Sequence, residues 1–345
     1  MINHTITEIV QHNCNIADSH NAGDYTLCIY LLKMREYYRW FNKISFSDPL
    51  QNAELGEWIS DQEQQWIELE SSEFHDIQID GHVFSVFDSD NINKALKPHG
   101  LVYSGGLGLG EQPHFFLGEL IKHEVIDDHH IYVSNNELAR DLTAPPAMSH
   151  GKSIFIRRES LRRMIWERLE EWRWKRGKGP MAKALAFYDF ENNLDQALDE
   201  MTNHEVDVLL HHEKGEILAG QELGEAWHHM LDTLPRSMAE FIVRAVRDHI
   251  ADCCSTLPML INQKRIASIH FYFGNFNAIR KKIFPALMQA YESWQLSGDF
   301  NDLSITVEEG LQHWLSISKQ ILALHQQYGD QCQQAIVDLL DDNPL

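Results

Sequence analysis

The stretch "LLHHEKGEILAGQELGEAWHHML", residues 209–231, carries four histidines and four glutamates, the residue types that bind metal ions or move protons. His212 and Glu216 are four residues apart, and His249 and Asp252 are three apart, so each pair would share one face of a helix. Such pairs are expected by chance in a chain with 20 histidines and 51 acidic residues. The direction in which each side chain points is therefore more informative than the spacing.

The apolar positions of this stretch indicate which glutamates face a core. Apolar or small residues recur at helical steps of three and four, namely Val206, Leu209, Gly220, Leu223, Trp227 and Met230. The positions in phase between Leu209 and Gly220 are Glu213 and Glu216. Buried carboxylates are costly unless they are paired or bound to a cation, so these two glutamates indicate a site.

Two more histidines are expected inside the same helical region. The helix "PRSMAEFIVRAVRDHIADCC" has inward positions Ala239, Ile242, Val246, His249 and Cys253. The segment "ASIHFYFGNF" places His270 among aromatic residues. Together these side chains resemble the ligands of carboxylate-bridged metal sites in helical bundles. We predict a divalent metal, iron, zinc or manganese, bound by His212, Glu213, Glu216, His249 and His270.

Other interpretations of these residues stay open. The diiron pattern needs an ExxH on each of two helices, and in "HEKGE" Glu216 stands where the zinc-peptidase motif HExxH has its second histidine. Gly215 could change the phase of the helix. The glutamates could also form buried ion pairs with Arg244 or Arg247, or act as a metal-free acid and base.

A second polar cluster lies near the N-terminus. It contains His12, Cys14, Asp18, His20 and Asp24. The asparagines and the glycine among these residues predict a loop, with Asp24 as the N-cap of the following helix, rather than a metal site.

The elements that must hold these residues can be read from the spacing of apolar positions. "DYTLCIYLLKMREYYRWF" and "DPLQNAELGEWISDQEQQWIEL" predict helices, the second with Asp48 as N-cap and Pro49 in its first turn. Residues 71–158 contain short β-branched and aromatic runs that predict a small antiparallel sheet, with a hairpin through "SGGLGLGEQPHFF". Beyond "KRGKGP", residues 175–180, helical spacing predicts a bundle of about five or six helices.

The predicted fold class is therefore α+β and predominantly α. We expect an N-terminal domain over 1–174, with helices in 1–70, the sheet in 71–158 and an arginine-rich helix over 159–174. A C-terminal helical bundle is expected over 181–345, with the boundary at the glycine and proline residues between them. A chain of 345 residues exceeds the size of a single core, in agreement with two domains.

Composition limits the classes of function. No stretch is apolar enough to span a membrane, and the first residues lack a basic start and an apolar run, so we expect a cytoplasmic protein. Five cysteines without a CxxC spacing fit reduced thiols. Neither glycine-rich stretch has the spacing of a dinucleotide fingerprint or a phosphate-binding loop.

The charge is strongly negative but uneven. The net charge of −22 predicts no binding of duplex nucleic acid, whereas residues 152–183 hold eleven Lys or Arg against four acids. The arginine-rich helix buries Leu161, Ile165, Leu169 and Trp172, so its arginines point elsewhere. We expect them to pair with acids of the same chain, as Arg163 can with Glu167; contact with a protein partner or single-stranded RNA is the alternative.

Four phrases of the sequence resemble an uncharacterised bacterial family: "TLCIYLLKMREYYRW", "APPAMSHGKSIFIRRESLRRMIWERLEEWRW", "HEKGE" and "HFYFGNF". The resemblance spans most of the chain and implies neither an activity nor a site residue. The residues themselves predict a metal-dependent oxidase or hydrolase with its site in the C-terminal bundle. The alternative is a non-catalytic assembly or regulatory protein that binds a partner through the arginine-rich helix and the acidic surface.

Overall fold

The computed structural model describes residues 2–108, 112–126 and 128–345, with side chains from residue 4 onward. The chain forms two compact units. The N-terminal unit comprises Met1–Glu170 and Phe190–Asn203, and the C-terminal unit comprises Glu171–Asp189 and His204–Leu345. The predicted boundary at 175–180 lies near the start of the C-terminal unit, where one helix ends at Lys175 and the next begins at Pro180.

The first helix overturns the predicted N-terminal loop. Helix α1 (Ile2–Asn21) is followed by the short helix η1 (Ala22–Asp24), α2 (Leu27–Phe41) and α3 (Asn52–Leu69). In α1 the residues Ile6, Val10, Cys14 and Ala17 are buried at helical spacing. Burial of this face outweighs the low helix propensity of its asparagines and histidines.

Two predicted caps are also wrong. Helix α2 is preceded by Thr26 rather than Asp24, and α3 begins after Gln51 rather than after Asp48. Instead, Asp48 lies in the connection between α2 and α3, where its backbone carbonyl accepts a hydrogen bond from Arg39.

Two sheets form the β part of the N-terminal unit. Strands β1 (Ile77–Ile79) and β2 (His82–Phe84) form a small antiparallel pair, followed by α4 (Ser89–Leu96) and η2 (Lys97–His99). The larger sheet has the order β3-β4-β5-β7-β6. Its strands are β3 (Leu101–Leu107), β4 (Pro113–Ile126), β5 (His129–Arg140), β6 (Ala147–His150) and β7 (Ser153–Arg157).

The larger sheet is mixed rather than antiparallel throughout. After β5 the chain first forms the edge strand β6 and then returns as β7, which pairs with β5 in the parallel sense. The predicted hairpin is confirmed, because β3 and β4 pair antiparallel; residues 109–111 of its connection lie outside the described residues.

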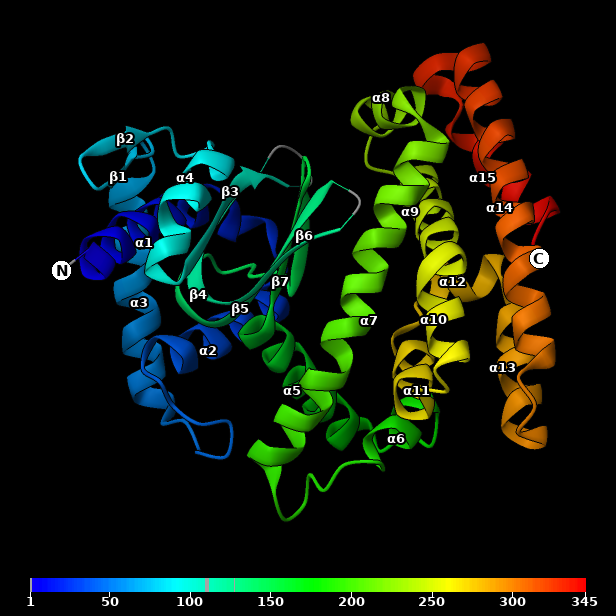
Figure 1. Ribbon diagram of the computed structural model, residues 1–345, viewed down its shortest axis with the longest axis horizontal. Helices are drawn as coiled ribbons and strands as arrows, with labels where there is room; N and C mark the ends of the chain where they lie inside the picture. Colours follow the sequence, from blue (N-terminus) through cyan, green and yellow to red (C-terminus); the bar gives the residue numbers. More distant parts are fainter. Residues whose placement is uncertain (1, 109–111, 127) are drawn as a thin grey trace. The chain divides into compact units, whose positions relative to one another are not determined.

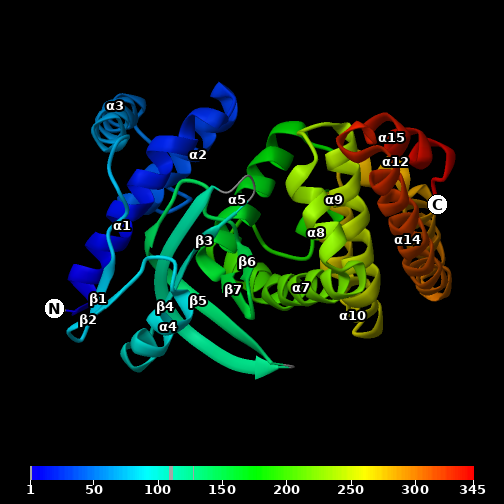
Figure 2. The same ribbon diagram turned by 90° about the horizontal axis from the view of Figure 1, so that it is seen from above.

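A bulged part of the sheet lies under α1. Helix α1 packs against β4 and β5, as Figure 2 shows from above. The register of β4 and β5 shifts at Gly118, which pairs with Glu137. A Cβ atom on Gly118 would lie 3.1 Å from the backbone oxygen of Asn136, so glycine allows the strands to approach closely here. Bulges of this kind redirect side chains and often lie beside functional sites.

The arginine-rich helix α5 (Arg158–Lys175) follows β7 directly. Leu161, Ile165 and Leu169 are buried as predicted, whereas Trp172 is only half-buried. The long helix α7 (Leu194–Leu223) contributes residues to both units.

The C-terminal unit is helical, with more and shorter helices in its described residues than the five or six expected. Besides α7 it contains α6 (Pro180–Leu185), α8 (Glu225–Thr233), α9 (Met238–Ala251), the π-helical turn η4 (Asp252–Thr256), α10 (Leu257–Asn262), α11 (Ile266–Asn275), α12 (Ala278–Ile283), α13 (Pro285–Ser297), α14 (Asn301–Tyr328), η5 (Gly329–Gln331) and α15 (Gln333–Asp342). Figure 1 shows α9 between α7 and α14, and the largest core cluster of this unit gathers around α9. None of the described helices is long and apolar enough to cross a bilayer.

The stretch 209–231 is not one helix. Gly224 adopts φ +74° and separates α7 from α8. The buried face predicted for α7 is also shifted, because Gly215 rather than Glu216 makes the close contact with α9. A Cβ atom on Gly215 would lie 2.3 Å from the backbone oxygen of Ala251. Glu213 is nevertheless buried, with 7% of its surface exposed, whereas Glu216 is half-buried.

Candidate functional site

The residues predicted to bind a metal lie on three helices of the C-terminal unit. On α7, His212 Nε2 lies 3.5 Å from Glu216 Oε1. His249 on α9 is completely buried, as predicted, and stacks on Trp314 with ring centroids 5.0 Å apart. His270 on α11 bonds instead to the hydroxyl of Tyr291, with 2.8 Å between Nδ1 and oxygen.

The centre of this region is Asp252, which was not among the predicted ligands. Its Oδ1 lies 2.9 Å from His212 Nδ1, its Oδ2 accepts a hydrogen bond of 2.8 Å from the hydroxyl of Tyr272, and it forms an ion pair with Arg280. Burial alone would raise the pKa of Asp252, but the charges of Arg280 and His212 outweigh it and hold the pKa below its usual range. Its position three residues after His249 was the only sequence signal for this role.

His212 lies between two carboxylates. Burial alone would lower its pKa, but Asp252 and Glu216 outweigh this effect and raise the pKa well above its usual value. The imidazole is thus held in its protonated form, whereas a metal ligand must be neutral.

The carboxylates that would bind a metal form ion pairs with arginines instead. Arg247 donates to Glu216 Oε1 at 3.0 Å, which is one of the ion pairs that the network interpretation named, and Arg280 takes Asp252. Arg280 also lies 3.5 Å from His249 Nδ1. Across the described ranges, no group of three or more His, Cys, Asp or Glu side chains is arranged to hold a metal ion. The geometry therefore favours an ion-pair network, and the metal site stays a prediction.

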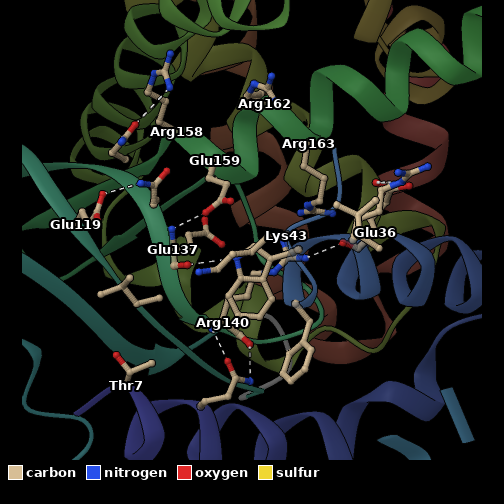
Figure 3. A pocket seen from close by; sticks show the side chains of 18 of the residues that line it. Thr7, Glu36, Lys43, Glu119, Glu137, Arg140, Arg158, Glu159, Arg162 and Arg163 are labelled. Atoms are coloured by element: carbon tan, nitrogen blue, oxygen red, sulfur yellow. Dashed lines mark hydrogen bonds and ion pairs between the residues drawn. The ribbon is translucent and has the colours of Figure 1, made fainter. Parts of the chain in front are cut away.

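A different candidate site lies in the N-terminal unit, where the sequence did not point. A pocket of about 1240 Å³ is bordered by α1, α2, the connection after α2, α3, β4, β5, α5 and the start of α7. Figure 3 shows its lining side chains. The cationic ones are Arg39, Lys43, Arg140, Arg158, Arg162 and Arg163.

The arginines of α5 are paired within the chain, as predicted. Arg162 binds Asp195 at 2.7 Å and Asp199 at 2.9 Å, and Arg158 lies 3.6 Å from Asp199. The predicted pair of Arg163 with Glu167 is confirmed at 2.8 Å.

Glu137, which lines the pocket, belongs to a buried ion pair with Arg157. Both guanidinium nitrogens of Arg157 that face Glu137 donate to it, at 2.9 and 2.8 Å, and Ser160 Oγ adds a third hydrogen bond of 2.6 Å. Burial alone would raise the pKa of Glu137, but Arg157 and Arg140 outweigh it, so the pKa is lowered and the carboxylate is ionised.

Arg140 has no such partner. Its side chain is only 2% exposed, and among the described residues no carboxylate lies within ion-pair distance of it. One nitrogen, Nη2, donates to the backbone oxygen of Glu36 at 3.3 Å, while Nε has no hydrogen-bond partner in the described chain. The guanidinium lies 4.8 Å from the ring centroid of Trp40. Burial and the charge of Arg163 lower the pKa of Arg140 to about 10, so it remains charged at neutral pH.

Glu159 lies beside this charge. Its Oε2 accepts a hydrogen bond from the backbone N–H of Glu137. Burial and the negative charge of Glu137 raise the pKa of Glu159 to about 6. Figure 3 places Glu137, Glu159, Arg140 and Lys43 around the same part of the pocket. Two carboxyl groups with pKa values moved in opposite directions are typical of sites that handle charged ligands or protons.

These features define a predominantly helical α+β protein whose N-terminal unit holds a polar pocket lined by both cations and carboxylates. The chain belongs to a family of unknown function, DUF6866: the model of its N-terminal domain matches residues 5–157 and that of its C-terminal domain matches residues 162–343. Comparison with curated proteins and with solved structures finds no match. The two family domains meet where β7 passes into α5, so the pocket includes residues from both.

Proposed function

We propose that the N-terminal unit binds a small anionic ligand, a carboxylate, sulfate or phosphate group, in the pocket around Arg140. The observation that supports this proposal is the buried guanidinium, which makes no ion pair with any carboxylate of the described residues. Glu137 and Glu159 act on this charge only from beyond ion-pair distance. A buried charge without a direct partner is destabilising, and an anion that enters the pocket supplies that partner. The guanidinium geometry suits oxyanions because it presents several donors in one plane.

The remaining lining supports the same class of ligand. Lys43 has no carboxylate within ion-pair distance among the described residues, so it adds a second available positive charge. Trp40 holds the guanidinium of Arg140 against its ring, and the exposed ring of Phe41 offers an apolar wall. Small-ligand sites commonly combine a few converging polar groups with aromatic walls.

Isothermal titration with sulfate tests the proposal. We expect wild-type protein to bind sulfate, and Arg140→Met to lose affinity by about tenfold or more because charge-assisted hydrogen bonds disappear. Arg236→Gln, which removes an exposed arginine of the C-terminal unit, should bind as wild type does. Absence of sulfate binding by wild type, or equal binding by Arg140→Met, would contradict the proposal.

The metal-dependent oxidase or hydrolase expected from the sequence stays a second hypothesis. Its support is that His212, Glu216 and Asp252 lie together on α7 and at the start of η4. The partner-binding alternative is less favoured, because Arg158, Arg162 and Arg163 of α5 already pair with acids of this chain.

A further inference from the structure

Glu137 and Glu159 differ in what their carboxyl oxygens contact. Both oxygens of Glu137 are taken by Arg157 and Ser160, so this carboxylate is fully partnered. Glu159 uses Oε2 to accept the backbone N–H of Glu137, and its Oε1 makes no hydrogen bond within the described chain. Glu159 lines the pocket, so Oε1 is the oxygen left for a ligand.

We propose that Glu159 binds the ligand as a protonated carboxyl, donating its Oε1–H to an oxygen of the anion held by Arg140, so that the anion enters together with one proton. This inference rests on the proposed function. It narrows the ligand to oxyanions that offer a second oxygen beside the one bound to Arg140. No covalent bond changes: the proton comes from solvent and returns to it when the anion leaves.

The surrounding charges explain why binding should bring in a proton. Glu159 faces Glu137 and Arg140 on β5 and Arg157 on β7. Arg140 and Arg157 both favour ionised Glu159 in the empty pocket. Arg157 is paired with Glu137, so Arg140 is the one of these two cations that is left to bind an anion. An anion on Arg140 cancels this effect and repels a carboxylate, and both changes favour protonation. The pKa of Glu159, already about 6, then rises further.

Other charged groups of the pocket must be separated from this effect. Arg163 on α5 and Lys43 after α2 are further cations of the lining, and both are kept in every variant that is compared. His12 on α1 also lines the pocket, and burial lowers its pKa. Protonation of His12 would likewise favour an anion at low pH, so the experiment must distinguish it from Glu159.

Sulfate is the probe, because its own charge does not change between about pH 5 and pH 8. For wild type we expect the dissociation constant of sulfate to rise with pH once the pH exceeds the pKa of Glu159 in the ligand-free protein. The rise should approach about tenfold per pH unit if one proton is taken up with the anion. Calorimetric titration in two buffers with different ionisation enthalpies should give different heats of sulfate binding. We expect the difference to equal the difference between the two ionisation enthalpies multiplied by about one proton. The calorimetric result requires no variant.

Glu159→Gln is the decisive variant, because the amide keeps a donor and cannot ionise. We expect it to bind sulfate with an affinity independent of pH, at the level of wild type at low pH. Glu200→Gln, a change of an exposed glutamate outside the pocket lining, should retain the pH dependence of wild type.

The outcomes separate this inference from the proposed function. Sulfate binding that requires Arg140 but takes up no proton would overturn the role of Glu159 and leave the anion site standing. A pH dependence that persists in Glu159→Gln would assign it to another titratable group of the lining, His12 or Glu36, and equally overturn the inference. Failure of wild type to bind sulfate at any pH would overturn both.

Discussion

Glu137 binds Arg157 through both carboxylate oxygens, and the two side chains are almost completely buried. Arg140 lies three residues further along the same strand and is equally buried, yet none of the described carboxylates pairs with it. One strand thus carries one end of a satisfied ion pair and one guanidinium that makes no ion pair with the described carboxylates. The same substitution at Arg157 and Arg140 should have opposite effects on stability.

Arg157→Met should destabilise the protein. It leaves the carboxylate of Glu137 buried without its cation, and breaking a buried pair in this way costs about 3 to 5 kcal/mol. Urea unfolding measures the difference. Lys152→Met, which removes a cation from an exposed ion pair with Asp128, should change stability by less than about 1 kcal/mol. A loss in Arg157→Met as small as in this control would show that the pair is not structurally important.

Arg140→Met should stabilise the ligand-free protein. The change removes a buried unpaired charge and keeps an unbranched apolar stem, so we expect a gain on the order of 1 to 2 kcal/mol, lessened by loss of the contact with Trp40. Thermal melts without added oxyanions check this. A loss of stability would instead make Arg140 a structural residue.

Glu205 should make the C-terminal unit less stable as pH rises. Burial raises the pKa of Glu205 to about 7, although Ser268 Oγ donates a hydrogen bond of 2.6 Å to its Oε1. The folded protein therefore holds a proton that the unfolded chain releases near its ordinary value of 4.5. Its stabilising contribution is complete below that value and is lost as pH rises to about 7.

Glu205→Gln removes this dependence. At pH 8 we expect the variant to be more stable than wild type by about 2 to 3 kcal/mol, and near about pH 4 the two should be similar. Glu200→Gln, at an exposed position of the same helix, should follow wild type at both pH values. A Glu205→Gln variant that is less stable at pH 8 would show that ionised Glu205 has a partner.

The double variant Glu213→Gln, Glu216→Gln separates the metal site from the ion-pair network. Because Arg247 already binds Glu216 and this pair is partly exposed, we expect a loss of about 1 kcal/mol that is the same with and without chelator. Elemental analysis of wild type, purified without a metal column, completes the test. Stoichiometric metal in wild type, absent from the variant, would support the metal-dependent hypothesis.

Gly215→Ala should destabilise the contact between α7 and α9. The new Cβ atom would lie 2.3 Å from the backbone oxygen of Ala251, and relief of this overlap requires a backbone shift that costs about 1 to 3 kcal/mol. At Gly220 the nearest atom to a new Cβ is His228 Nε2 at 3.5 Å. Gly220→Ala should therefore be neutral or stabilise by up to about 1 kcal/mol.

Local patterns predicted much of the fold. The apolar spacing located α5 and α9, with His249 inside. The short β-branched and aromatic runs located β1 to β5 and β7, but not the edge strand β6. Prediction from local patterns failed where tertiary contacts outweigh local conformational preference. The polar residues of α1 are helical because the opposite face of the helix is buried on the sheet. Strand β7 lies parallel to β5 because the chain forms the edge strand β6 first and then returns between β6 and β5.

The candidate pocket was beyond the reach of sequence patterns. Its residues come from α1, α2, α3, β4, β5, α5 and α7, which are spread along the chain, and none of these segments carries a recognisable motif. Arg140 is the last residue of β5 and has no distinctive spacing in the sequence, so only the three-dimensional structure shows that none of the described carboxylates pairs with it. In the C-terminal unit, spacing brought His212 and Glu216 together correctly but could not show that arginines would reach the carboxylates first.

Helix α7 crosses from one compact unit to the other without interruption, and its first part carries Asp195 and Asp199, which bind Arg162. Segments of the two units therefore alternate along the sequence, so that no single boundary in the chain separates one unit from the other. A fragment that ends at residue 174 would lose one wall of the pocket and strand its arginines, so genetic dissection of this protein should retain the first turns of α7 with the N-terminal half.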